Sequence, residues 1–171
     1  MNLLQPRSSL RICRADYANA AHAAALVYLL DAYARDPMGG GEPLSDFAKV
    51  HLVSSLATCS QAFSVLAFSG PDDDIPVGLV NCFEGFSTFA CRPLVNVHDV
   101  AVLPDYRGQR VAEQMLNLVE EIARERGSCK LTLEVLQGNA GAIKLYTRVG
   151  FSNYQLDPNT GQAQFLQKWL A

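Results

Sequence analysis

The sequence predicts an α/β (α+β) fold, in which one mixed β-sheet of about seven strands is flanked by about four helices. Two observations predict it. Short apolar runs alternate with longer runs of helical period, and their order, β-α-α-β-β-β-α-β-α-β-β, contains no repeat and no linker. A chain of 171 residues is long enough to bury one adequate core, so we expect a single domain over residues 1–171.

The first third of the chain predicts one strand and two helices. Ser9–Cys13 alternates in polarity and is expected to be a strand. Asp16 is the expected N-cap of an Ala/Leu-rich helix over Tyr17–Ala34. A Pro-Met-Gly-Gly-Gly segment ends that helix, and Ser45 is expected to cap a second helix that runs to about Ala57.

Three strands are expected in the middle of the chain. Phe63–Phe68 and Pro76–Phe86 flank a hairpin loop that contains Asp72–Asp74. Three adjacent carboxylates could bind a metal, but a solvated acidic loop is far more common, so we expect no metal. Leu94–Val102 is apolar nearly throughout, which is typical of a central strand.

The last third predicts a strongly amphipathic helix, then further strands around a second helix. Val111–Arg126 carries one apolar stripe and is followed by Gly127, a residue that commonly ends helices. A strand is expected at Lys130–Val135 and a helix at Ala140–Val149. The chain is then expected to finish with two strands, Phe151–Leu156 and Gln162–Trp169.

Composition restricts the partners and the compartment. The net charge of −3 argues against nucleic acid or an anionic membrane as the main partner. No apolar run reaches the length of a membrane span, and the N-terminal residues lack the core of a signal peptide. The five cysteines are scattered and form no CxxC pair, which favours reduced thiols. We therefore expect a cytoplasmic protein.

A Gly-containing turn, Arg107–Ala112, joins the predicted strand Leu94–Val102 to the amphipathic helix. A helix N-terminus reached in this way presents backbone N–H groups and a positive dipole end to an anion, usually a phosphate. Gly108 would allow a ligand to approach the backbone closely. The alternative is an ordinary strand-to-helix turn with surface arginines.

A second pattern lies in the helix Ala140–Val149 and its flanks. Asn139 stands where an N-cap is expected, and Tyr146 returns to the same helix face seven residues later. Ala142 is small enough for a ligand to lie against the helix. On helix position alone, Tyr146 is more simply explained as a tyrosine packed on the sheet.

Together the two segments resemble the acyl-CoA site of the GCN5-related N-acetyltransferases, over roughly Leu94–Phe151. The resemblance implies the acyl-CoA N-acyltransferase fold, acetyl-CoA as the co-substrate and no metal. Where the family usually has Gly in the turn, this chain has Arg110. We expect helical backbone angles there, which would make a side chain tolerable. A positive φ at this position, or a CoA molecule passing over it, would weaken or abolish CoA binding. The residues implied to bind acetyl-CoA are Val100, Ala101, Val102, Arg107, Gly108, Gln109, Arg110, Val111, Ala112, Asn139, Ala142 and Tyr146.

The resemblance also implies the catalytic groups. Tyr146 matches the family's proton donor, which would protonate the departing CoA sulfur. His98 is the expected base, because a neutral imidazole can accept a proton from an ammonium; a packed histidine with a satisfied ring is the alternative. Asp99 would orient a neighbour or bind the acceptor amine, and Glu84 is a weaker candidate for amine binding. Strict alternation would place His98 and Asp99 on opposite faces unless a β-bulge intervenes.

The segment GFSTFACRPLVNVHDVAVLPDYRG further resembles the diamine and polyamine acetyltransferase branch, with His98 in place of an acidic residue. We expect an N-acetyltransferase that acts on a primary amine of a small molecule: a polyamine, a diamine or an amino-acid-like amine. Acetylation of a protein lysine or N-terminus is one alternative, and a non-catalytic acyl-CoA sensor is another. A homodimer is the expected assembly.

Overall fold

The computed structural model describes residues 10–72, 74–154, 157, 159, 161 and 163–170. The chain forms two compact units, Met1–Leu133 and Glu134–Ala171. The second unit contains the helix α4 (Ala140–Arg148). The first contains β1 (Leu10–Arg14), α1 (Ala20–Arg35), α2 (Asp46–Thr58), β2 (Ala62–Ser69), β3 (Ile75–Ser87), β4 (Arg92–Val102), a short 3-10 helix (Pro104–Tyr106), α3 (Val111–Glu125) and β5 (Leu131–Leu133).

The strands of the first unit form one mixed sheet in the order β1-β2-β3-β4-β5. The first three pairings are antiparallel, and β4 pairs with β5 in parallel. The predicted α+β class and mixed sheet are thus confirmed, whereas the expected seven strands are not, since the described residues form five. Residues 151–154 and 163–169 form no strand, and residues 155, 156 and 162 lie outside the described part. Local sequence indicates where a strand is tolerated, but a strand also needs a neighbour to pair with its backbone.

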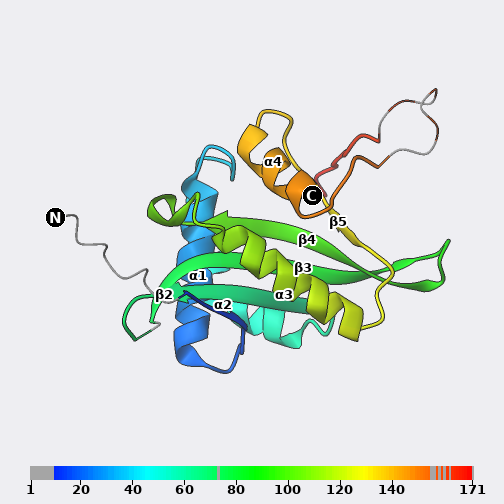
Figure 1. Ribbon diagram of the computed structural model, residues 1–171. Helices are drawn as coiled ribbons and strands as arrows, with labels where there is room; N and C mark the ends of the chain where they lie inside the picture. The colour runs from blue at the N-terminus through cyan, green and yellow to red at the C-terminus, as the bar shows by residue number, and fades with distance from the viewer. Residues whose placement is uncertain are drawn as a thin grey trace. The chain divides into compact units, whose positions relative to one another are not determined.

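Helices cover both faces of the sheet in the first unit, with α3 on one face and α1 and α2 on the other (Figure 1). Leu26, Leu29 and Leu56 of α1 and α2 pack with Leu66 and Leu79 in a buried core. On the α3 face, Gly78 permits close packing, because a Cβ there would lie only 2.8 Å from Met115 Cε. Four residues of the expected apolar stripe of α3 are buried, namely Val111, Met115, Val119 and Ile122, whereas Leu118, the fifth, is only partly buried.

The N-terminus of α1 differs from the prediction, whereas that of α2 agrees with it. Asn19, rather than Asp16, caps α1, because its side chain accepts hydrogen bonds from the N–H groups of Ala21 and His22. Asp16 instead accepts from the Ala18 N–H, at 2.9 Å, in the turn before the helix. Ser45 caps α2 as predicted. Two good capping residues three positions apart compete, and the sequence does not rank them.

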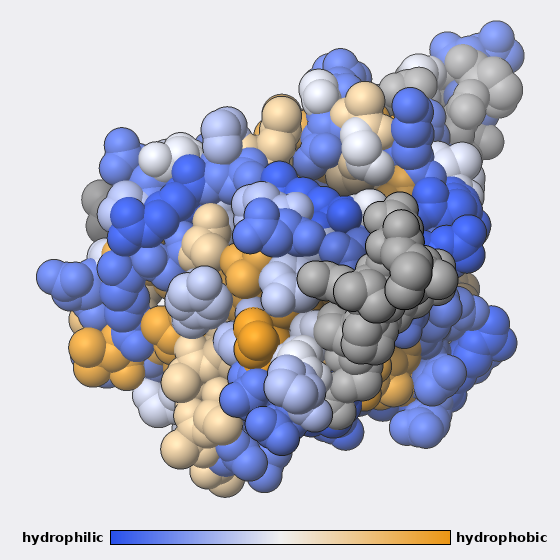
Figure 2. Space-filling model, turned by 60° about the vertical axis from the view of Figure 1, so that its left-hand side comes forward, coloured by the Kyte–Doolittle hydropathy of each residue, from blue (hydrophilic) through white to orange (hydrophobic). Residues whose placement is uncertain are grey.

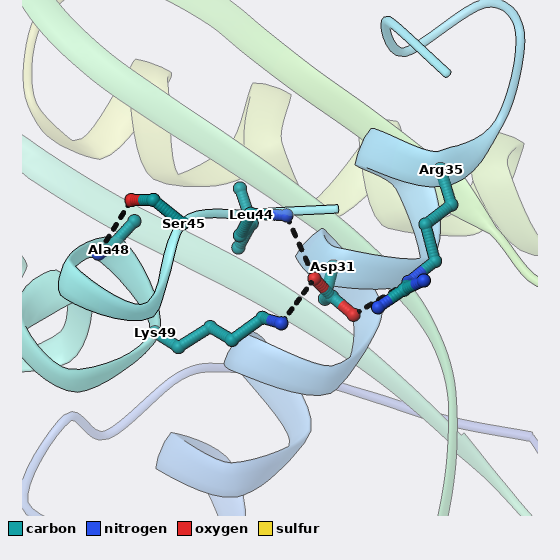
Figure 3. Close-up of polar contacts among 6 residues, drawn as sticks. All are labelled: Asp31, Arg35, Leu44, Ser45, Ala48 and Lys49. Atoms are coloured by element: carbon teal, nitrogen blue, oxygen red, sulfur yellow. Dashed lines mark hydrogen bonds and ion pairs between the residues drawn. The ribbon is translucent and has the colours of Figure 1, made fainter. Parts of the chain in front are cut away.

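Asp31 on α1 contacts α2 and the segment that connects the two helices, as Figure 3 shows. Its Oδ2 accepts a hydrogen bond from Arg35 Nε at 2.9 Å, and its Oδ1 accepts one from the Leu44 N–H at 2.9 Å. Lys49 Nζ on α2 lies 3.2 Å from the same Oδ1. The hydrogen bond from Arg35, followed by those from Leu44 and Lys49, lowers the pKa of Asp31 below its ordinary value of 3.8.

The Asp31 cluster predicts how stability depends on acid. A carboxyl whose pKa is depressed by folding stabilises the native state above its unfolded-state pKa and loses that effect as the pH falls through the folded value. Asp31→Asn should therefore lower the free energy of unfolding at neutral pH and flatten its decline in acid. Urea unfolding between neutral and acidic pH measures this. Glu42→Gln makes the same charge change in the same connection, and equal effects of both variants would contradict the prediction.

In the view of Figure 2, hydrophilic groups cover much of the upper surface, and apolar groups gather mainly at the lower left. Over the described residues, no helix has the length and apolar character needed to cross a membrane. Among the same residues, no three His, Cys, Asp or Glu side chains gather as a metal site. Asp73 of the acidic loop lies outside the described part.

Candidate functional site

The turn between β4 and α3 leaves the start of α3 open. The chain passes from the 3-10 helix through Arg107–Arg110 into α3, with Gly108 at φ 75°. Arg110 occupies the N-cap position, and its side chain makes no capping hydrogen bond. The first N–H groups of an α-helix have no partner within the helix, and here no side chain of the N-cap occupies them. They form a fitting site for a phosphate group.

The backbone of Arg110 corrects a prediction. Helical angles were expected, but φ is 62° and ψ is 20°, in the left-handed region. A residue with a Cβ pays about 1–2 kcal/mol in this region, whereas Gly adopts it freely. Arg110 therefore carries a side chain at a position whose backbone angles favour glycine. The arginine side chain extends outward, and its Nη1 lies 3.8 Å from Glu113 Oε1.

Replacing Arg110 by a residue that adopts positive φ without strain should stabilise the protein. We expect Arg110→Gly to raise the free energy of unfolding by about 0.5–1 kcal/mol, since the relieved strain exceeds the added flexibility of the unfolded chain. Gln109→Gly is the control, because Gln109 does not have positive φ, and it should destabilise. Urea unfolding of both variants checks the prediction, and a loss of stability in Arg110→Gly would contradict it.

The side chains of Arg107 and Gln109 in the turn form hydrogen bonds and an ion pair within the protein. Arg107 Nε donates to the Val102 carbonyl at 3.0 Å, and its Nη2 pairs with Asp36 Oδ2 at 2.9 Å. The Met38 N–H, together with Arg107, lowers the pKa of Asp36. Gln109 Nε2 donates to the Asp105 carbonyl at 2.9 Å. Backbone N–H groups, more than these side chains, are therefore available to an anion.

One edge of β4 lacks a neighbouring strand beside the turn. β4 pairs with β3 from Arg92 to Val102, but β5 pairs only with Val95–Val97. Val100–Val102 thus has β3 on one side and, among the described residues, no strand on the other. Such an edge can pair with the amide groups of an extended ligand. The Val102 carbonyl already accepts from Arg107.

β4 contains a β-bulge at His98, directly before Asp99. Asn81 pairs with Asp99 and Cys82 pairs with Val97, which leaves His98 as the extra residue. A bulge of this kind interrupts strict alternation and redirects side chains. The parity of the sequence therefore does not decide the faces of His98 and Asp99.

His98 and Asp99 both lie on the face covered by α1 and α2. The His98 ring meets the Phe83 ring edge-on with centroids 5.4 Å apart, and Phe83 packs on the core of that face. Asp99 Oδ2 accepts a hydrogen bond from Asn81 Nδ2 at 3.0 Å. His98 is exposed and Asp99 is partly buried. An imidazole and a carboxylate, from adjacent residues, thus lie on one sheet face at the bulge.

Asp99 is linked by hydrogen bonds to a series of polar side chains that were not predicted from the sequence. Ser64 Oγ donates to Asn81 Oδ1 at 2.6 Å, and the Tyr17 hydroxyl lies 2.9 Å from Ser64 Oγ. Ser64 and Asn81 are only 1% and 3% exposed. The sequence signal that could have revealed these residues is one polar residue inside each of two apolar strands. Ser64 lies in β2 and Asn81 lies in β3, both at buried positions.

Glu84 lies apart from this group. It follows Phe83 on β3, so alternation turns its side chain to the α3 face. There its Oε2 lies 3.4 Å from Nη1 of Arg126, the C-cap of α3. The structure therefore does not bring Glu84 together with His98 and Asp99.

The second unit carries the remaining predicted residues. Asn139 caps α4 as predicted, since its Oδ1 accepts from the Ala142 N–H at 3.1 Å. Tyr146 follows two turns later, and its ring lies 5.9 Å from that of Phe151. The Phe151 N–H donates to the Tyr146 carbonyl at 2.9 Å, and Gly150 at φ 99° lets the chain leave the helix.

Comparison of the sequence with known protein families agrees with this arrangement of a strand edge, a turn and an open helix start. The family model of the acetyltransferase (GNAT) family matches residues 29–151. The chain therefore belongs to the GNAT family of acetyltransferases.

Individual relatives are similar over part of their length. A thialysine N-epsilon-acetyltransferase of Bos taurus is 32% identical over 92 residues, which cover 54% of either chain. A streptothricin acetyltransferase of Streptomyces lavendulae is 36% identical over 75 residues, 44% of this chain and 40% of the relative. The chain thus matches about half or less of the length of these relatives.

Solved structures show the fold. The aminoglycoside N-acetyltransferase AAC(6')-Iy, solved in complex with CoA, superposes with a TM-score of 0.72 at 19% identity. The superposition covers 97% of this chain and 99% of that one. At this level of identity the likeness defines the fold alone.

Proposed function

We propose that this protein transfers an acetyl group from acetyl-CoA directly to a primary amine of a small molecule. The observation that carries the proposal is the β4–α3 segment, in which an unpaired strand edge leads into a helix start with no capping side chain. Membership of the GNAT family supports acetyl-CoA as the donor. The family match crosses the boundary between the two units, which supports a single acetyltransferase domain over residues 1–171.

The chain's own groups suit the parts of the donor. The N–H groups from Gly108 to Ala112 would hold the pyrophosphate, and the edge Val100–Val102 would pair with the pantetheine arm. From the family resemblance, Asn139 and Ala142 of the second unit are also proposed to contact acetyl-CoA. A backbone N–H of the β4 edge would polarise the thioester carbonyl. Acetyl-CoA supplies the activated acyl group, and no cysteine of the chain is assigned as a nucleophile.

The proposed transfer requires three proton movements. Asp99 binds the ammonium of the acceptor, and His98 removes one proton from it, directly or through water. The free amine then forms the bond to the acyl carbon as the carbon–sulfur bond breaks. Tyr146 gives its phenolic proton to the departing sulfur, and its oxygen takes back the proton that the nitrogen loses on becoming an amide, so that free CoA thiol and the acetylated amine are released.

The acceptor is proposed to carry a primary amine that one carboxylate can bind. Relatives named for thialysine and streptothricin favour small molecules of this class, including amino-acid-like amines and polyamines. Glu84 is left out of the acceptor site because of its place on the α3 face. The scattered, unpaired cysteines support the proposal of a cytoplasmic enzyme, and a homodimer is proposed as its assembly.

Two measurements test the proposal. Calorimetric titration should detect acetyl-CoA binding, and the ligand should stabilise the fold by about 2.7 kcal/mol at 100 times its dissociation constant. A panel of spermidine, putrescine, lysine and thialysine should then show release of CoA thiol. Absence of binding at millimolar acetyl-CoA would overturn the proposal. Binding without any turnover would favour a sensor, and turnover with peptides alone would favour a protein acetyltransferase.

A further inference from the structure

Three buried or half-buried polar residues connect the loop before α1 to Asp99 across the sheet. Tyr17, Ser64 and Asn81 lie in one row, because Ser64 pairs with Asn81 and Asn81 with Asp99 in the strand register. Side-chain hydrogen bonds of 2.9, 2.6 and 3.0 Å join the four residues in sequence. Buried polar groups are costly unless each is satisfied, and apolar residues would fill the same core positions without that requirement.

The direction of every bond in this row follows from the carboxylate. An ionised carboxylate only accepts, so Asn81 turns its NH₂ group to Asp99 and its oxygen to Ser64. Ser64 has one hydroxyl proton, which it donates to Asn81. The Tyr17 hydroxyl is therefore the donor to Ser64. Burial raises the pKa of Tyr17, which keeps this donor protonated.

The hydrogen bonds of this row hold the Asp99 carboxylate through only one of its two oxygens. Asp99 Oδ2 accepts from Asn81, and no residue in the described ranges donates a hydrogen bond to its Oδ1. His98 and Phe83 lie beside it on the same sheet face. Tyr33 of α1 is also close, since burial and then the charge of Asp99 raise the pKa of Tyr33. Oδ1 is therefore available to a cation in a partly aromatic surrounding.

We infer that Tyr17, Ser64 and Asn81 are positioning residues that orient Asp99 so that its Oδ1 binds the acceptor ammonium. The inference rests on the proposed function and deepens it, because it assigns acceptor recognition to residues away from the β4–α3 segment. Loss of the row should leave the carboxylate in place but allow it to rotate. Acceptor binding should then weaken while acetyl-CoA binding does not change.

The central test is a double-mutant cycle between Ser64→Ala and Asp99→Asn. With the best amine of the panel above, Ser64→Ala should raise the acceptor KM by about tenfold, as expected when an ordered contact to a charged group is lost. In the Asp99→Asn background, the same change should alter KM by no more than about twofold, because its effect acts through Asp99. Tyr17→Phe, which keeps the ring, should act in the same direction with a smaller effect.

Ser69→Ala is the matched control, because Ser69 lies on the same strand and is 2% exposed. It should leave the acceptor KM unchanged, and unfolding curves should show that every variant is folded. An unchanged KM in both Ser64→Ala and Tyr17→Phe would overturn this inference alone. An equal effect of Ser64→Ala with and without Asp99 would also overturn it. A wild-type protein that acetylates no amine would overturn the proposed function and this inference together.

Discussion

Replacement of Tyr146 by Phe should lower turnover by about 10²–10⁴ and leave acetyl-CoA affinity nearly unchanged. The change removes only the hydroxyl and keeps the ring that lies 5.9 Å from Phe151. A general acid acts in the transition state, where the sulfur gains charge, so its loss affects the chemical step more than ground-state binding. Steady-state kinetics with thiol detection, together with calorimetric titration of acetyl-CoA, separates the two effects.

Tyr154→Phe is the control for this experiment, since it removes a hydroxyl from another tyrosine of the second unit. Its turnover should match that of the wild type. Turnover within a few-fold of wild type in Tyr146→Phe would return Tyr146 to a packing role. A large loss of acetyl-CoA affinity in the same variant would instead assign the hydroxyl to binding.

Local signals explain the parts of the fold that the sequence predicted well. Ser45 and Asn139 cap their helices as expected, because a cap depends on one side chain and the N–H groups three residues away. The apolar stripe of α3 is largely buried as expected, since helical period places those residues on one face. The open start of α3 also follows from local sequence, because a turn with Gly108 directly precedes it.

Nonlocal geometry explains what the sequence did not reveal. The bulge at His98 is a mismatch between β3 and β4, and neither strand alone encodes it. Without the register, Glu84 and Asp99 could not be assigned to opposite faces, and Ser64 could not be linked to Asn81. The positive φ of Arg110 could not be read from the residue type, because glycine is the residue that favours this backbone angle. Pairing partners also decide whether a segment such as residues 163–169 becomes a strand.

Replacement of His98 by Gln should lower turnover at neutral pH by about 10²–10⁴, the usual effect of losing a general base. Glutamine is similar in size but cannot accept a proton under these conditions. The bulge places the imidazole beside Asp99 and against Phe83 on one sheet face, so the base and the expected ammonium site are adjacent. The variant should recover part of its activity as the pH rises, because more of the acceptor is then already unprotonated. Initial rates across a pH series, at saturating acetyl-CoA, measure both effects.

His51→Gln is the matched control, since His51 is an exposed histidine of α2 whose ring also contacts a phenylalanine ring, in this case stacked with centroids 4.2 Å apart. Its pH profile should equal that of the wild type. An unchanged profile in His98→Gln would transfer the role of base to Asp99 or to a water molecule. Asp99→Asn then distinguishes these two: a carboxylate base would be lost together with the pH dependence. A water acting as base would leave the pH dependence in place and raise only the acceptor KM, because the ammonium would no longer be bound by a charge.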